Sequence, residues 1–199
     1  MRVIFFSGLK GGTGKTTLAV HFCNYIHFYE KKTVCLVSFD KQRILSLLAR
    51  KDNSPYQVIE TAIEEFGAVF LESLQQQYIV VDFPGTSIEE AVIQHWAFAD
   101  VHVLPFGSSA LDFYKLLAFF QLASKGNIQL KQTYLLPNQY DKKAGSVMLK
   151  NIQQQPIFST SVMLPPIIKS NNFINVNFLP LNSTIVNYCR PSFRYIAHK

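Results

Sequence analysis

The residues with the clearest chemistry form a glycine-rich loop near the start of the chain. The loop reads Lys10-Gly11-Gly12-Thr13-Gly14-Lys15-Thr16-Thr17 and lies between an apolar run at 2–7 and a helical pattern at 15–30. Glycines let backbone N–H groups converge on an anion where side chains would clash, and the start of the helix adds its dipole. Lys15 can reach nucleotide phosphates and the Thr16 hydroxyl can ligate Mg²⁺. We therefore expect all eight loop residues to bind a nucleotide, namely ATP with Mg²⁺.

A second chemical feature is an aspartate that ends an apolar strand. Tyr78-Ile79-Val80-Val81 is followed by Asp82. A carboxylate at the end of a buried strand needs its charge compensated, and Mg²⁺, held through a water molecule, would do this. Thr16 and Asp82 are thus the expected metal residues. The five histidines and the cysteines Cys23, Cys35 and Cys189 have no metal-ligand or disulfide spacing, which suits free thiols in a reducing cytoplasm.

Apolar strand-like runs alternate with helical patterns along the chain. Strands are expected at 2–7, 33–38, 56–59, 78–81, 101–105 and 132–136, and helices at 15–30, 41–50, 62–76, 87–98, 110–124, 142–154 and 183–198. We expect Pro191 to break or start the last helix. Continuous apolar strands separated by helices predict an α/β fold: one doubly wound, mostly parallel sheet with helices on both faces, in a single domain over 1–199.

The loop also carries a resemblance to a known family. K-G-G-x-G-K-T-T, with Leu9 where the ordinary phosphate loop has its first glycine, resembles the deviant loop of the ParA/MinD ATPases. The strand ending at Asp82, with Phe83-Pro84-Gly85 after it, resembles the family's Walker B strand and second switch. Further similarities are Asp40 in a D-x-D-P-Q-like segment, the Ala99–Pro105 strand with Asp112 after it, and Asn138 after the strand at 132–136. The resemblance covers about residues 2–180.

The resemblance implies roles for individual residues. Lys10 would cross an ATP-bound dimer to the partner's nucleotide, so Lys10, Lys15 and Asp40 are the expected catalytic residues. Asp40 would orient the attacking water, although Ser38 and Lys41 replace the family's first Asp and its Pro. Gly85 would donate its N–H to the γ-phosphate, and Asn138 would lie near the adenine. Asn138-Gln139-Tyr140-Asp141 also resembles the guanine motif N-K-x-D, so GTP remains an alternative. Asp112 would shape the fold and the dimer face.

Charge distribution suggests the partner. The first 141 residues carry a balance of −1, whereas the last 58 carry seven Lys/Arg and no acid. Such asymmetry favours an anionic partner, and DNA phosphates would be contacted without sequence specificity through Arg190, Arg194 and Lys199. A solvated basic face without a partner is the alternative.

The resemblance then implies a cytoplasmic, nucleoid-associated partition ATPase working with a ParB-like centromere-binding protein or a cargo adaptor. Positioning of a protein cargo and MinD-like membrane binding are alternatives, the latter disfavoured because Pro191 interrupts the terminal amphipathic pattern. A nitrogenase iron-protein-like carrier would need cysteines after the Walker B strand, and a small-molecule kinase would need an acceptor pocket that the sequence does not reveal.

Overall fold

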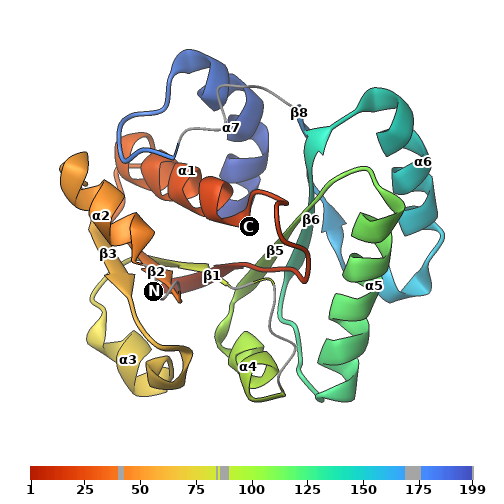
Figure 1. The fold of residues 1–199 in the computed structure, drawn as a ribbon, viewed down its shortest axis with the longest axis horizontal. Helices are drawn as coiled ribbons and strands as arrows, with labels where there is room; N and C mark the ends of the chain where they lie inside the picture. The colour runs from red at the N-terminus through yellow and green to blue at the C-terminus, as the bar shows by residue number, and fades with distance from the viewer. Residues whose placement is uncertain (40–42, 84, 86–89, 169–175, 199) are drawn as a thin grey trace.

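The computed structural model builds the protein around an eight-stranded sheet (Figure 1). It describes residues 1–39, 43–83, 85, 90–168 and 176–198. The strands are β1 (Arg2–Phe6), β2 (Val34–Ser38), β3 (Gln57–Glu60), β4 (Tyr78–Asp82), β5 (Val101–Phe106), β6 (Thr133–Tyr140), β7 (Val162–Met163) and β8 (Ile167–Ile168). Their order is β3-β2-β4-β1-β5-β6-β7, and β8 pairs with the later part of β6. Every pairing between these strands is parallel, which confirms the expected fold class.

Helices cover both faces of the sheet. The helices α1 (Lys15–Phe28), α2 (Ile44–Lys51) and α7 (Ser183–His198) pack on one face. The other face is covered by α3 (Ala68–Ser73), α4 (Glu90–Gln94), α5 (Ala110–Lys125) and α6 (Lys142–Gln153). Each face buries its own hydrophobic core. Strands between two such cores must be apolar on both sides, which explains their continuous apolar sequences.

Three expectations about element boundaries were wrong. The patterns at 62–76 and 87–98 are not single helices: each combines a 3₁₀ turn, Ile63–Glu65 or His95–Phe98, with a short α-helix. Between the first pair, Phe66 and Gly67 have extended backbones, and Phe66 is buried in the core. In addition, β6 extends to Tyr140, so Asn138 lies within the strand and not after it.

The last helix passes through its proline. Pro191 lies inside α7, which is continuous from Ser183 to His198. Pro lacks the N–H that would bond to the carbonyl of Asn187, but both residues are exposed, so water can satisfy that carbonyl. The apolar side of α7, which includes Cys189, Phe193 and Ile196, is buried completely. This packing stabilises the helix despite the missing hydrogen bond.

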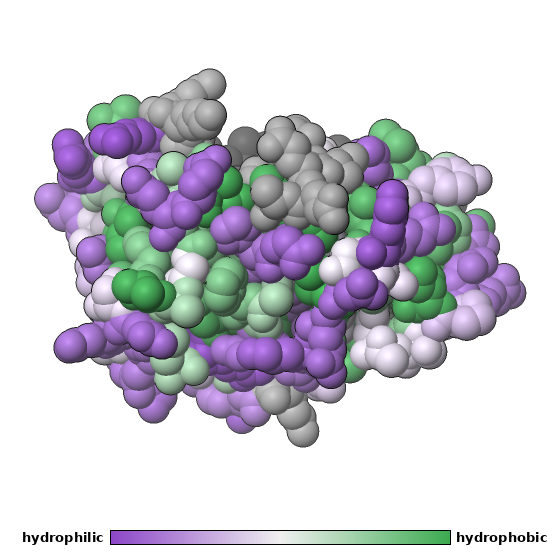
Figure 2. Space-filling model, turned by 90° about the horizontal axis from the view of Figure 1, so that it is seen from below, coloured by the Kyte–Doolittle hydropathy of each residue, from purple (hydrophilic) through white to green (hydrophobic). Residues whose placement is uncertain are grey.

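Figure 2 views the side of the molecule on which α3 and α4 lie. A hydrophobic area is visible there, bordered by hydrophilic side chains. The six-residue α3 buries only Leu71, and this leaves Val69 83% exposed.

Candidate nucleotide site

The glycine-rich loop joins β1 to α1 at the carboxyl end of the central strand. Gly12 and Gly14 have φ angles of 74° and 87°, which lie in the left-handed region that favours glycine. A Cβ on Gly11 or Gly12 would meet nothing within 4 Å, whereas one on Gly14 would lie 2.5 Å from Nδ2 of Asn138. The loop is therefore open where an anion would enter and tight against the sheet where it is anchored.

Lys15 is held inside this loop. Its Nζ donates a hydrogen bond of 2.7 Å to the carbonyl oxygen of Lys10. Burial lowers the pKa of the Lys15 ammonium, an effect that the Asp82 carboxylate partly offsets. A Cβ on Gly85 would lie 2.5 Å from Lys15 Nζ, so the backbone of Gly85 packs directly against the cation. Burial disfavours the charged form of Lys15, and a negatively charged phosphate oxygen beside Nζ would stabilise it.

Thr16 and Asp82 meet at the other side of the loop. The Thr16 hydroxyl donates to Oδ2 of Asp82 at 2.7 Å. Asp82 ends β4 and is in register with Phe6 at the end of β1, the neighbouring strand. This pairing places Asp82 beside the loop that carries Thr16. A hydroxyl and a carboxylate are both hard oxygen ligands that suit Mg²⁺, directly or through water. The glycine cradle, the buried cation and this oxygen pair fit a nucleotide with Mg²⁺.

Lys10 has a partner that the sequence did not reveal. Its Nζ lies 2.9 Å from Oδ2 of Asp112 and 3.3 Å from the Ser109 hydroxyl. Ser109 and Asp112 form a capping box at the start of α5. Burial would raise the pKa of Asp112, but the hydrogen bonds from Ser109 and Lys10 outweigh it, so that pKa lies below its ordinary value. The lysine expected to reach a second subunit is bound within its own chain here.

Two buried contacts anchor the loop to the sheet. Asn138 on β6 donates from Nδ2 to the Thr13 carbonyl at 2.8 Å. Ser7, the residue after β1, lies 3.2 Å from Nδ1 of His102 on β5, and Nε2 of His102 lies 3.0 Å from the Trp96 carbonyl. Since a carbonyl only accepts, Nε2 carries the proton and Nδ1 accepts from Ser7. Burial lowers the pKa of His102 to about 4, so the ring is neutral.

Of the other expected site residues, the structure describes some and leaves others outside the described ranges. Thr13 is buried, and Thr17 is half-buried in the first turn of α1. Asp40 and Lys199 lie outside the described residues. Their expected roles therefore stay predictions.

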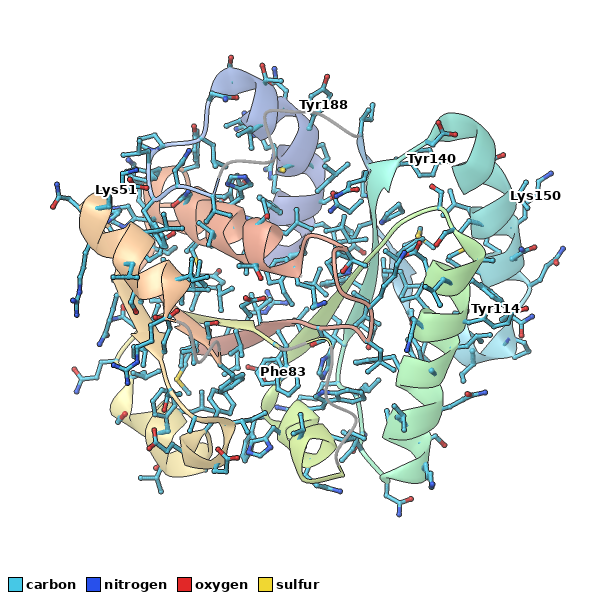
Figure 3. The ribbon with its side chains drawn as sticks, viewed as in Figure 1. Lys51, Phe83, Tyr114, Tyr140, Lys150 and Tyr188 are labelled. Carbon is cyan, nitrogen blue, oxygen red and sulfur yellow. The ribbon has the colours of Figure 1, made fainter. Side chains whose placement is uncertain are left out.

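The described basic side chains of the last third, Lys150, Arg190 and Arg194, do not gather on one face. Arg190 and Arg194 are exposed one turn apart on α7, as a continuous helix requires. Lys150 projects from α6, which covers the opposite face of the sheet (Figure 3). Glu30, near the arginine pair, contacts His198 at 3.0 Å and accepts from Tyr25 at 2.6 Å. Among the described residues, the C-terminal basic charge therefore includes a local arginine pair on α7.

The membrane alternative can be compared with the packing of α7. Its buried apolar residues, among them Cys189, Phe193 and Ile196, pack with α1 and the sheet in the core, whereas Tyr188 and Tyr195 are each 36% exposed. Within the described ranges, no helix is both long and apolar enough to span a membrane.

Comparison with known proteins agrees with this geometry. The family model described as the CobQ/CobB/MinD/ParA nucleotide binding domain matches residues 4–175. No curated protein sequence matches the chain.

Solved structures share the fold at low sequence identity. A plasmid partition protein from Borrelia burgdorferi B31, bound to AMPPNP, is 15% identical with a TM-score of 0.75, and the match covers 100% of this chain and 99% of that one. A variant of Cyanothece McdA in complex with ATP is 17% identical with a TM-score of 0.70, covering 98% and 95%. MinD from Aquifex aeolicus is 18% identical with a TM-score of 0.65, covering 100% and 98%.

Proposed function

This chain belongs to the CobQ/CobB/MinD/ParA nucleotide-binding domain family, and we propose that it is an ATP-dependent switch that dimerises with Mg²⁺ and ATP and then binds DNA non-specifically. The observation that carries the proposal is the convergence of Lys15, Thr16 and Asp82 around an open glycine cradle. Partner-stimulated hydrolysis would release the DNA, which is the cycle of a partition ATPase.

Each residue of the cradle has a definable task. Bound Mg²⁺ and ATP would supply the metal charge and the scissile γ-phosphate. Lys15 neutralises phosphate charge, and the glycine N–H groups orient the phosphates. Thr16 and Asp82 would exchange their mutual hydrogen bond for contacts to the metal shell. Gly85 has its backbone at Lys15 Nζ, where its N–H would meet the terminal phosphate.

Nucleotide affinity tests the cradle. Lys15→Ala removes the buried cation, and we expect calorimetry to detect no binding of ATP with Mg²⁺. The matched control is Lys31→Ala, an exposed lysine beyond the end of α1, which should bind ATP as the wild type does. Wild-type affinity in Lys15→Ala would show that the loop is not a nucleotide site. Competition between ATP and GTP in the same experiment would decide the preferred base.

Dimerisation tests the role of Lys10. Two facing loops crowd negative phosphates together, and a lysine from each subunit would offset that repulsion. Lys10→Ala should therefore bind ATP as a monomer, while the wild type sediments as a dimer with ATP and as a monomer with ADP. A Lys10→Ala dimer, or a wild-type monomer with ATP, would contradict the assignment.

Hydrolysis tests the role that we propose for Asp40. A residue that orients the attacking water acts on the transition state. Asp40→Ala should therefore keep ATP-dependent dimerisation and lose phosphate release. Phosphate release at the wild-type rate from the variant would remove Asp40 from the catalytic residues.

The arginine pair on α7 is the proposed DNA contact. Both side chains are exposed on a rigid helix, and joining two pairs in a dimer would make binding depend on ATP through bivalency. We expect the double variant Arg190→Glu and Arg194→Glu to lose DNA binding but to keep ATP-driven dimerisation.

The control has the same charge change on the other face of the sheet. Lys125→Glu with Lys150→Glu alters α5 and α6, and this variant should retain DNA binding. A gel-shift series across salt concentrations, with ATP and with ADP, is the measurement. Equal DNA binding with ATP and with ADP would contradict the proposed ATP-dependent switch. If the wild type did not bind DNA even at low salt, positioning of a protein cargo or a MinD-like cycle would be favoured.

A further inference from the structure

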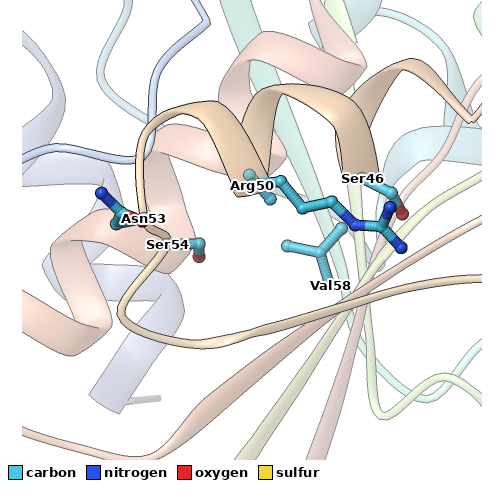
Figure 4. Close-up of a pocket in the computed structure, with 6 residues that line it drawn as sticks. Ser46, Arg50, Asn53, Ser54 and Val58 are labelled. Carbon is cyan, nitrogen blue, oxygen red and sulfur yellow. The ribbon is translucent and has the colours of Figure 1, made fainter.

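One edge of the sheet, formed by β3, borders a groove whose lining residues lie outside the phosphate loop. β3 is the terminal strand in the sheet order, and an open groove of about 500 Å³ lies between it and α2. Six residues line the groove: Ser46, Ala49, Arg50, Asn53, Ser54 and Val58. Figure 4 shows the Arg50 side chain extended along the groove toward Ser46, above Val58.

The groove is cationic. Arg50 is exposed, and within the described part of the chain its side chain makes no hydrogen bond or ion pair. The described lining residues include no carboxylate. Two acids lie close in sequence to the lining residues. Asp52 accepts from the backbone N–H of Phe178 at 3.1 Å. Glu60 accepts through its two carboxylate oxygens, each at 3.1 Å, from the backbone N–H groups of Leu45 and Ser46 at the start of α2. The charge of Glu60 is thus already compensated, and that of Arg50 is not.

The outer edge of β3 offers backbone hydrogen bonds beside this arginine. The N–H of Thr61 bonds to the Ser38 carbonyl of β2, so Ile59, two residues earlier, also faces β2, in register with Val37. Successive residues of a strand direct their backbone groups to opposite sides. Val58 and Glu60 therefore point their N–H and C=O groups away from β2, where a further strand could pair.

We propose that the groove binds an extended acidic segment of a partner protein, which adds to the sheet next to β3. Backbone pairing with Val58 and Glu60 would provide the register, and alternate side chains of the segment would face α2. An acidic side chain opposite Val58 would reach the Arg50 guanidinium, whereas one opposite Glu60 would meet a like charge. The groove would therefore select a segment with one acidic residue at the position opposite Val58 and no acid opposite Glu60. Exposed Ile44 and Leu47 on α2 would contact flanking apolar residues.

Peptide binding tests the charge preference. The probe is a fluorescent, end-blocked peptide that alternates valine with serine and carries a single glutamate in place of one central serine. It is compared with the same peptide carrying lysine at that position, and the readout is anisotropy with the nucleotide-free full chain. We expect the glutamate peptide to bind. Arg50→Glu should weaken it at least about tenfold, the size of one charge-assisted contact, and should confer binding of the lysine peptide.

A neighbouring lysine provides the matched control. Lys51→Glu changes the net charge equally on the same helix, but Lys51 does not line the groove. It should alter the affinity by no more than about twofold, as expected for an exposed charge. If Arg50→Glu and Lys51→Glu lost peptide affinity equally, the binding would depend only on the overall positive charge of the protein, and the proposal would be overturned. Failure of the wild type to bind, or displacement of the peptide by equimolar inorganic phosphate, would also overturn it, the second in favour of a small-anion site.

Hydrogen exchange tests the geometry independently of charge. On adding the glutamate peptide, the amides of Val58 and Glu60 should exchange more slowly, while that of Ile59 should not change. Val58→Pro removes one outward N–H at an edge position that tolerates proline, and it should abolish peptide binding while the chain still binds ATP. Undiminished peptide binding by Val58→Pro, or protection confined to α2, would refute strand addition.

Discussion

Acidification should weaken the fold through one buried histidine beside the phosphate loop. His102 is inaccessible to solvent, donates from Nε2 to the Trp96 carbonyl and accepts from the Ser7 hydroxyl at Nδ1. A proton on Nδ1 would turn that acceptor into a second donor and leave a buried charge. Protonation therefore opposes the native contact that fixes Ser7 at the entrance to the loop.

The magnitude follows from the two pKa values. Burial lowers the pKa of His102 from 6.5 to about 4. Between pH 6.5 and 4, the unfolded chain binds a proton at this residue and the folded chain does not, so the free energy of unfolding falls as the pH falls. One pKa unit corresponds to about 1.4 kcal/mol, so the full loss is about 3 kcal/mol and is complete near pH 4. Above pH 6.5 this contribution is fully present and constant.

Urea unfolding at a series of pH values measures the effect. His102→Gln keeps a donor for the Trp96 carbonyl but does not titrate. Its free energy of unfolding should fall less steeply than that of the wild type, by about 1.4 kcal/mol per pH unit between pH 6 and 4.5. The control is His27→Gln at a partly exposed position, which should keep the wild-type slope. Parallel pH profiles for wild type and His102→Gln would refute the reasoning.

Three further outcomes follow from the loop geometry. Asp112→Asn should release Lys10 from its intrachain ion pair and lower the dissociation constant of the ATP dimer about threefold by sedimentation equilibrium, as expected for a partly exposed pair; a weaker dimer would show that Asp112 serves the interface instead. Gly85→Ala should reduce ATP affinity in calorimetry, because its Cβ would lie 2.5 Å from Lys15 Nζ and 3.1 and 3.2 Å from the carbonyl oxygens of Gly8 and Lys10, and unchanged affinity would contradict this. Gly14→Ala should lower the free energy of unfolding by at least about 1 kcal/mol in urea, because φ is 87° there; unchanged stability would show that the loop relaxes.

Local sequence was sufficient to predict the geometry of the candidate phosphate loop. The contacts of Lys15 and Thr16 depend on a loop of fixed spacing between a strand and a helix, and the pairing of Thr16 with Asp82 needs only that β4 lie next to β1. Continuous apolar runs marked the central strands for the same reason: both faces are covered, so composition alone identifies them.

Long-range contacts could not be predicted in this way. Lys10 and Asp112 are 102 positions apart and meet only because β5 lies directly beside β1. Glu60 reads as an ordinary strand residue, and its function as a cap for α2 depends on how that helix packs against β3. The two-residue strands β7 and β8 are too short to carry a period. Proline dominated the expectation for α7, and its packing against α1 overrode that local preference.

The sheet order explains why the candidate site lies where it does. From β1 the chain builds β2, β3 and β4 on one side and then crosses to build β5 and β6 on the other, so the order reverses at β1. Ligands of such sheets bind at this switch point, beyond the carboxyl ends of the strands. Asp82 approaches the loop from β4, while Asp112 and Asn138 approach it from the β5 and β6 side. The Thr16–Asp82 pair and the Lys10–Asp112 pair are therefore on opposite sides of one loop, so the change in the Lys10 contact that we propose for assembly need not disturb the Thr16–Asp82 pair.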